Sequence, residues 1–271
     1  MLYEKIKLTN DKDVYLDTYV PDKVGDYTGK AILVIPGGGY GGVCSEREGE
    51  PIALAFLKYG YSAFVLHYSV GRENNFPKQL IEASLAIKHI KDNAEKYHIN
   101  PDEVFAVGFS AGGHLAGSLG IMWKIDEVQK SIDMPYGYNK PKGVMLIYPV
   151  VSGESFGHMG SFQNLAGCEN PSKEQLDSMS LEKHVDSDSV PAFIVHTVTD
   201  DCVNVRNSLV LGEAYAKVGK RFEMHIYPDA PHGVALGNEI TECGCSDWVD
   251  KCIAKWVEHA AEWAENPKSF N

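Results

Sequence analysis

Ser110 has the most distinctive chemical setting in the chain, within Gly108-Phe109-Ser110-Ala111-Gly112. This pentapeptide fits G-x-S-x-G, and it follows an apolar run and precedes a helical run of small residues. The flanking glycines give the space that a sharp strand-to-helix turn requires, since larger side chains would collide with the neighbouring backbone. The turn would place the Ser110 hydroxyl at a helix N-terminus, which favours developing negative charge. The motif predicts a nucleophilic serine, and the alternative is a glycine-rich turn without chemistry.

A serine hydroxyl becomes a good nucleophile when a base takes its proton, and a carboxylate usually orients that base. His232 is the predicted base, because it lies in the turn Pro231-His232-Gly233, where packing gives no reason for a histidine. Asp200 and Asp201 compete for the role of the acid, and both follow an apolar strand-like run. The chain order Ser, Asp, His, with the acid and the base each after a strand, fits a hydrolase triad.

Three other histidines have structural explanations. His114 lies one helical turn after Ser110, where its side chain should point away from the reacting face of the serine. His196 and His225 fall inside predicted strands, and we expect both to be packed rather than catalytic.

A glycine cluster, Pro36-Gly37-Gly38-Gly39-Tyr40-Gly41-Gly42, follows another strand-like run. A chain reversal made of glycines can present backbone N–H groups to a nearby anion. A phosphate loop is the competing interpretation, but it requires G-x-x-x-x-G-K-[ST], and no Lys-Ser or Lys-Thr pair follows the cluster. We therefore expect these N–H groups to face an oxyanion formed during acyl transfer.

The elements that must position these residues alternate between apolar strand-like runs and helical runs, which predicts a mostly parallel sheet flanked by helices. An antiparallel hairpin is expected at 3–8 and 13–20, followed by strands at 31–36, 62–68, 104–110, 143–150, 192–198 and 221–228. Helices are expected at 51–58, 77–98, directly after Ser110, at 207–218 and at 247–265. Residues 151–190 should form a small insertion of loops or short helices over the sheet edge. We expect residues 1–271 to fold as one α/β domain.

The composition and charge of the chain indicate which classes of partner and which cellular compartment to expect. The net charge of −12 would repel a polyanion, so nucleic acid is not an expected partner. No run approaches the roughly 18 to 20 apolar residues of a bilayer span, and the N-terminal residues lack the pattern of a secretion signal. The six cysteines suit reduced thiols, and Cys243, Cys245 and Cys252 lack the spacing and the fourth ligand of a zinc site. We therefore expect a cytoplasmic protein without a bound metal or a membrane partner.

Four motifs between residues 31 and 233, PGGGYGG, GFSAGGHLAG, HTVTDD and PHG, together resemble the acetyl esterase/lipase branch of the α/β-hydrolases. The resemblance implies an α/β-hydrolase fold with a mostly parallel sheet of about eight strands, and it implies no cofactor. It also implies that the backbone N–H groups of Gly38, Gly39 and Ala111 form the oxyanion hole. Pro36 stands where the family's HGGG loop has a histidine.

The acid loop adds to this resemblance. Many hydrolases carry Asp-x-x-Val-Pro after the next-to-last strand, and the chain matches it from Asp200 to Val203, with Asn204 in place of the proline. This match favours Asp200 over Asp201 as the acid. The substitution at Asn204 could alter how the acid loop is held.

Two further segments, EREGEP at 46–51 and LHYSVG at 66–71, resemble small bacterial esterases that remove acetyl groups from xylan and its oligosaccharides. The resemblance implies a serine carboxylesterase that deacetylates carbohydrate. A thioesterase or an amidase such as a formamidase, acting on a non-carbohydrate small molecule, is the nearest alternative, and a non-catalytic binding protein is another. The polar residues of 151–190 argue against a lipase. A homo-oligomer is one option for the assembly.

Overall fold

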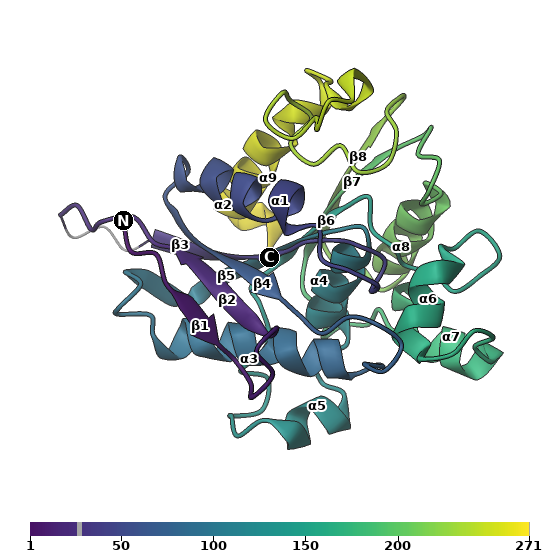
Figure 1. Cartoon of the computed structure of the whole chain (residues 1–271), viewed down its shortest axis with the longest axis horizontal. Coiled ribbons are helices and arrows are strands. Elements are labelled where there is room, and N and C mark those ends of the chain that lie inside the picture. The colour runs from purple at the N-terminus through teal and green to yellow at the C-terminus, as the bar shows by residue number, and fades with distance from the viewer. Residues whose placement is uncertain (26–28, 271) are drawn as a thin grey trace.

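The computed structural model describes residues 1–25 and 29–270. An eight-stranded sheet runs through it in the order β1-β2-β4-β3-β5-β6-β7-β8 (Figure 1). The strands are β1 (Lys5–Lys7), β2 (Tyr15–Tyr19), β3 (Gly29–Ile35), β4 (Tyr61–His67), β5 (Ile99–Phe109), β6 (Val144–Ile147), β7 (Ala192–Thr197) and β8 (Phe222–Tyr227). Strand β2 pairs antiparallel with β1 and β4, and all other pairs are parallel. The predicted mostly parallel sheet of eight strands is confirmed, as is its antiparallel hairpin.

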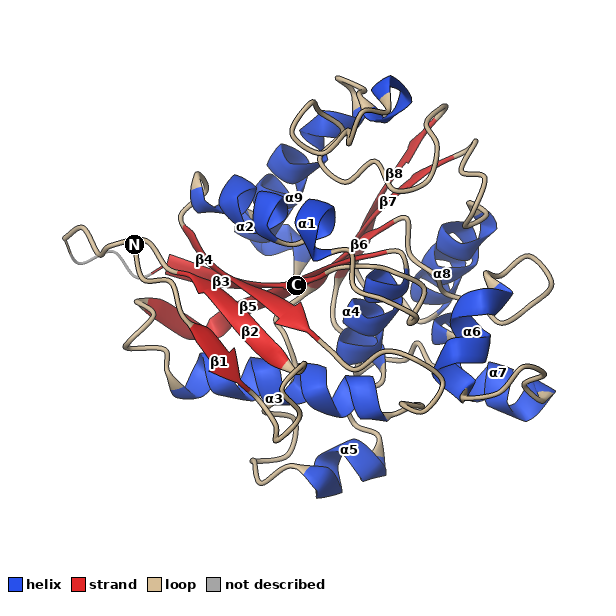
Figure 2. Ribbon diagram, in the orientation of Figure 1, coloured by secondary structure: helices blue, strands red, loops and turns tan. Residues whose placement is uncertain are grey.

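Helices cover both faces of this sheet, so its central strands are buried on both sides. In β3, Leu33 and Ile35 point into one apolar core, while Ile32 and Val34 point into the other, as the alternation of a strand requires. Helices α3 (Lys78–Asp92), α4 (Ala111–Ile121) and α8 (Arg206–Lys217) pack on the first core. Helices α2 (Glu50–Leu57) and α9 (Trp256–Glu265) pack on the second, across the sheet from α3 (Figure 2).

The helix predicted at 77–98 is shorter than expected. It ends at Asp92, where the Asn93 side chain donates to the His89 carbonyl at 2.8 Å. A side chain that bonds to the backbone in this way competes with continuation of the helix. The chain then turns, and β5 begins at Ile99, earlier than the predicted residue 104.

The C-terminal helix predicted at 247–265 was wrong in its first half, because α9 begins only at Trp256. The Asp250 carboxylate accepts from the N–H groups of Cys252 (2.7 Å) and Ile253 (2.8 Å), which starts a separate turn. Two 3₁₀ helices, Ser246–Trp248 and Ile253–Lys255, take the place of regular helix there.

The insertion at 151–190 forms short helices, in agreement with the prediction. These are α6 (Met159–Ala166), α7 (Lys173–Met179) and a 3₁₀ turn at Leu181–Lys183. Three short elements were not predicted, because none has a long apolar period: α1 (Ser45–Glu48), α5 (Asp126–Ser131) and a 3₁₀ turn at Pro267–Ser269.

No helix in residues 1–25 and 29–270 combines the length and the apolar character needed to cross a lipid bilayer. The six cysteines are unpaired. In the same ranges, no three His, Cys, Asp or Glu side chains gather in a way that could hold a metal ion.

His114 on α4 is packed in the interior, as predicted. Its Nε2–H donates to the Met179 carbonyl at 2.7 Å, and its Nδ1 accepts from the Tyr40 hydroxyl at 2.8 Å. Burial lowers the pKa of His114 to about 4, although the bond to Met179 opposes this shift. The neutral imidazole thereby joins α4, the insertion and the glycine cluster.

This buried imidazole predicts a pH-dependent loss of stability. Because the folded pKa lies below the ordinary value of 6.5, the unfolded chain binds more protons between pH 6.5 and 4, and the free energy of unfolding falls as the pH falls through that window. His114 should contribute about 1 kcal/mol per pH unit to this loss. Urea denaturation at pH 7 and pH 5 should therefore show a smaller loss in His114→Gln than in the parent. Equal losses in both proteins would contradict the prediction.

Candidate active site

Ser110 lies in a strained turn between β5 and α4, with φ 52° and ψ −118°. Gly108 and Gly112 have no room for a side chain. A Cβ on Gly108 would lie 2.1 Å from the Gly112 carbonyl oxygen, and one on Gly112 would lie 2.1 Å from the Ile35 carbonyl oxygen. The Ser110 N–H donates to the Ile147 carbonyl of β6 at 3.0 Å, which fixes the turn against the sheet.

The three residues predicted as a triad lie together. Ser110 Oγ is 2.9 Å from His232 Nε2, and His232 Nδ1 is 2.7 Å from Asp200 Oδ2. Since an ionised carboxylate can only accept, the proton belongs on Nδ1, and Nε2 accepts from the serine hydroxyl. The Asp201 carboxylate instead meets the backbone N–H of His232 at 3.5 Å. The geometry thus favours Asp200 over Asp201.

Asp200 is held by more than the imidazole of His232. Its Oδ1 accepts from the N–H groups of Cys202 (3.0 Å) and Val203 (2.8 Å). His196, which was expected to be a packed strand residue, is fully buried with its Nε2 3.3 Å from Asp200 Oδ2. Burial by itself would raise the pKa of Asp200, but hydrogen bonds from His196 and His232 outweigh it and hold the pKa well below its usual range. The carboxylate therefore stays ionised.

The glycine cluster turns back on itself after β3. Gly38 and Gly39 have φ angles of 127° and 63°, and the Gly38 carbonyl accepts from the N–H groups of Gly41 (3.0 Å) and Gly42 (3.1 Å). In the described part of the chain, no group accepts from the N–H of Gly38 or Gly39. Ala111 is the first residue of α4, where an N–H has no acceptor within the helix. The three predicted oxyanion donors are thus available to a ligand.

Helix α1 contacts both the glycine cluster and the loop that carries His232, and neither contact was predicted. Glu48 is buried; its Oε2 accepts from the Gly37 N–H and its Oε1 from the Tyr148 hydroxyl, each at 2.8 Å. Arg47 donates to the Gly233 carbonyl at 2.6 Å, next to His232. The segment EREGEP at 46–51 was singled out for its resemblance to small bacterial esterases and not for a contact, and a charged run such as 46–48 usually lies on the surface.

The insertion reaches the same site through α6. The Asn164 side-chain amide donates to the Gly39 carbonyl at 2.9 Å, and His158 Nδ1 lies 2.8 Å from the Ser161 hydroxyl. Burial lowers the pKa of His158, and the nearby His232 adds to this effect. Polar side chains of the insertion therefore border the glycine cluster.

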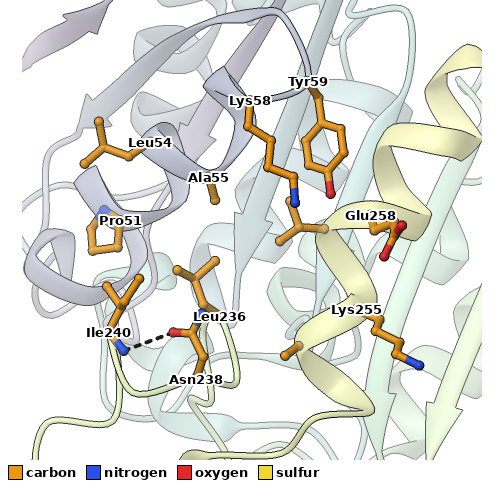
Figure 3. Close-up of a pocket in the computed structure, with 12 residues that line it drawn as sticks. Pro51, Leu54, Ala55, Lys58, Tyr59, Leu236, Asn238, Ile240, Lys255 and Glu258 are labelled. Carbon is orange, nitrogen blue, oxygen red and sulfur yellow. Dashed lines mark hydrogen bonds between the residues drawn. The ribbon is translucent and has the colours of Figure 1, made fainter.

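A separate cavity of about 490 Å³ opens between α2, residues 236–240 and α9 (Figure 3). Its wall includes the apolar side chains of Leu54, Leu236 and Ile240, and the Asn238 side chain accepts from the Ile240 N–H at 3.1 Å. None of the three triad residues lines this cavity, so the chemistry of the triad belongs elsewhere.

The arrangement at Ser110 suits acyl transfer. It provides a hydroxyl hydrogen-bonded to an imidazole, a buried carboxylate that orients this imidazole, and backbone N–H groups of the glycine cluster and of Ala111 that have no acceptor in the described part of the chain. In such a site, the donors stabilise the negative charge that forms when a hydroxyl attacks a carbonyl carbon.

Known proteins share this sequence pattern and this fold. The BD-FAE family matches residues 16–215. The chain is 38% identical over 213 residues to an endo-1,4-beta-xylanase B of Butyrivibrio fibrisolvens, and 28% identical over 237 residues to an acetylxylan esterase of Xylanibacter ruminicola. These matches cover 77% and 86% of this chain but 33% and 46% of the relatives, so the chain spans between a third and a half of their length.

A solved structure matches over almost the whole chain. The acetyl ester-xyloside bifunctional hydrolase from Caldicellulosiruptor lactoaceticus has a TM-score of 0.82 and 31% identity, with 99% of this chain and 97% of that chain covered. The chain is therefore an α/β-hydrolase that belongs to the BD-FAE family.

Proposed function

We propose that this chain is a serine carboxylesterase that hydrolyses short-chain esters through an acyl-enzyme on Ser110. The observation that carries the proposal is the continuous hydrogen-bond chain from Ser110 Oγ to His232 Nε2 (2.9 Å) and from His232 Nδ1 to Asp200 Oδ2 (2.7 Å). The 2.9 Å distance from Ser110 Oγ to His232 Nε2 is within the range that a general base needs to accept the serine proton.

In the first step, His232 takes the proton of Ser110, and the serine oxygen attacks the ester carbonyl carbon. The N–H groups of Gly38, Gly39 and Ala111 bind the resulting oxyanion. The bond to the alcohol breaks as the imidazolium gives its proton to the leaving oxygen, which leaves an acyl-enzyme. Water then repeats the sequence on the acyl carbonyl and releases the carboxylic acid.

Asp200 keeps the proton of His232 on Nδ1 and stabilises the imidazolium that forms in each half of the reaction. Because its pKa is held well below the usual range, this charge is present across the neutral and mildly acidic range. The carboxylate side chain is 1% exposed, so little water screens the interaction.

For the natural substrate, we favour an acetyl ester of a carbohydrate such as a xylo-oligosaccharide. Support comes from the relatives described as an acetylxylan esterase and an acetyl ester-xyloside bifunctional hydrolase. The polar side chains of His158, Ser161 and Asn164 beside the glycine cluster also suit a polar alcohol. A thioester or an amide of a non-carbohydrate small molecule would use the same triad and remains the alternative class.

We place the protein in a cytoplasm because its cysteines are unpaired, and we expect neither nucleic acid nor a membrane as a partner because of its net charge and composition. We propose one domain for residues 1–271, since both described cores pack on one sheet, with a homo-oligomer as an option.

Three variants test the assignment of the triad. Ser110→Ala and Asp200→Asn should each lower kcat on p-nitrophenyl acetate by about 10³-fold or more, because they remove the nucleophile and the group that orients the base. Asp201→Asn is the matched control and should stay within about threefold of the parent, since the Asp201 carboxylate meets the backbone N–H of His232 and not its ring. Parental activity in Ser110→Ala would overturn the proposed function.

A substrate panel tests the ester. The polar side chains of α6 beside the glycine cluster predict a higher kcat/KM for acetylated xylo-oligosaccharides than for p-nitrophenyl esters of long acyl chains, and higher than for N-formylkynurenine. Acetate release and chromogenic assays at equal enzyme concentration would rank them. A preference for the long acyl chains or for the formamide would contradict the proposed substrate.

A further inference from the structure

The buried Glu48 carboxylate has a place in the site that the triad mechanism does not explain. We propose that Glu48 is a positioning residue, which holds the Gly37 peptide so that the next two N–H groups face the carbonyl oxygen of the substrate. This inference rests on the proposed function, and it assigns to Glu48 no contact with the reacting atoms.

Gly37 lies between the Glu48 carboxylate and Ser110. A Cβ on Gly37 would lie 2.9 Å from Glu48 Oε2 and 3.0 Å from the Ser110 Cβ, so this one residue separates the carboxylate from the serine. Its N–H donates to Glu48 Oε2 at 2.8 Å, and its carbonyl accepts from the Cys44 N–H at 3.0 Å. Both backbone groups of Gly37 are therefore fixed by α1 and the residue before it.

Fixing the Gly37 peptide matters for the residues that follow. Gly38 and Gly39 have backbone conformations that only glycine adopts easily, and their N–H groups have no acceptor in the described part of the chain. The carbonyls of Gly37 and Gly38, which share a peptide with these N–H groups, accept from Cys44 and from Gly41 and Gly42, and the bond from the Gly37 N–H to Glu48 holds the peptide that precedes them. Oxyanion donors stabilise a transition state only when they are already aligned.

The other oxygen of the Glu48 carboxylate is linked through Tyr148 to the loop that contains His232. Glu48 Oε1 accepts from the Tyr148 hydroxyl at 2.8 Å, and this hydroxyl accepts from the Ala235 N–H at 3.0 Å. The Tyr148 ring packs edge to face on His232, with ring centroids 4.9 Å apart. The Glu48 carboxylate therefore joins the glycine cluster, through Tyr148, to the segment after His232.

The chemistry of the group fits this role. Burial raises the pKa of Glu48, while the bonds from Gly37 and Tyr148 oppose the shift. A buried carboxylate costs stability unless its oxygens are bonded, so an apolar residue would serve better if packing were the only requirement. The two donors meet different oxygens of the carboxylate, so a glutamine in the same position would turn its NH2 group toward one of them and lose that bond.

Glu48→Gln is the direct test, and Glu82→Gln is a matched control. Glu82 is also buried, and its carboxylate accepts from one backbone N–H and one hydroxyl, both of Ser69. Per mole of folded protein, Glu48→Gln should lower kcat on p-nitrophenyl acetate by about tenfold or more, with KM within about threefold, because alignment acts in the transition state. Glu82→Gln should keep the parental kcat.

Affinity for a tetrahedral analogue separates positioning from a purely structural effect. Phenylboronic acid should bind Glu48→Gln more weakly, by a factor close to the loss in kcat, and should bind Glu82→Gln as it binds the parent. A Glu48→Gln protein with a lower melting temperature but parental kcat and parental boronic acid affinity would overturn the proposal.

Tyr148→Phe keeps the test decisive if Glu48→Gln fails to fold. It removes one of the two donors that hold the Glu48 carboxylate and should lower kcat by about threefold or more with KM unchanged, and parental kcat in this variant would overturn the positioning role of Glu48. If Glu48→Gln has parental kcat while Ser110→Ala is inactive, the role of Glu48 is overturned and the proposed function stands. Parental activity in Ser110→Ala overturns the proposed function itself.

Discussion

Ser110 occupies a turn in which α4 folds back so closely on β5 that a single added carbon on Gly108 would lie 2.1 Å from the Gly112 carbonyl oxygen. This close approach determines where every other part of the site must lie. It directs the hydroxyl toward the end of the sheet at which β3, β7 and β8 also end, since parallel strands bring their carboxyl ends to one edge. Three loops meet there because each follows one of those strands: the glycine cluster after β3, the loop of Asp200 after β7 and the loop of His232 after β8.

Two buried carboxylates then serve the site in different ways. Asp200 is bonded by two histidines and two backbone N–H groups, which hold its pKa well below the usual range and keep a charge beside His232. Glu48 is bonded by one backbone N–H and one hydroxyl, and burial raises its pKa. The first carboxylate lies beside the His232 imidazole, while the second joins the Gly37 N–H to the Tyr148 hydroxyl.

Much of this could be predicted from local patterns. Glycine spacing around Ser110, the glycine cluster and the turn at His232 are local features, and an order of apolar runs is enough to predict a parallel sheet. The residue pattern alone left Asp200 and Asp201 open, because adjacent residues differ only in the direction of their side chains, and it was the resemblance to Asp-x-x-Val-Pro that favoured Asp200. The helix predicted at 247–265 failed at Asp250, whose side chain bonds the backbone locally. Glu48 could not be predicted, since its partners Gly37 and Tyr148 are distant in sequence from one another.

Covalent trapping tests most directly whether Ser110 is the nucleophile. A fluorophosphonate probe should form one stable adduct, and mass spectrometry of the digested protein should locate it on the peptide that contains Ser110. A structure of this adduct should place the phosphonyl oxygen within hydrogen-bond distance of the N–H groups of Gly38, Gly39 and Ala111. An active enzyme that forms no adduct, or forms it on another residue, would contradict the account.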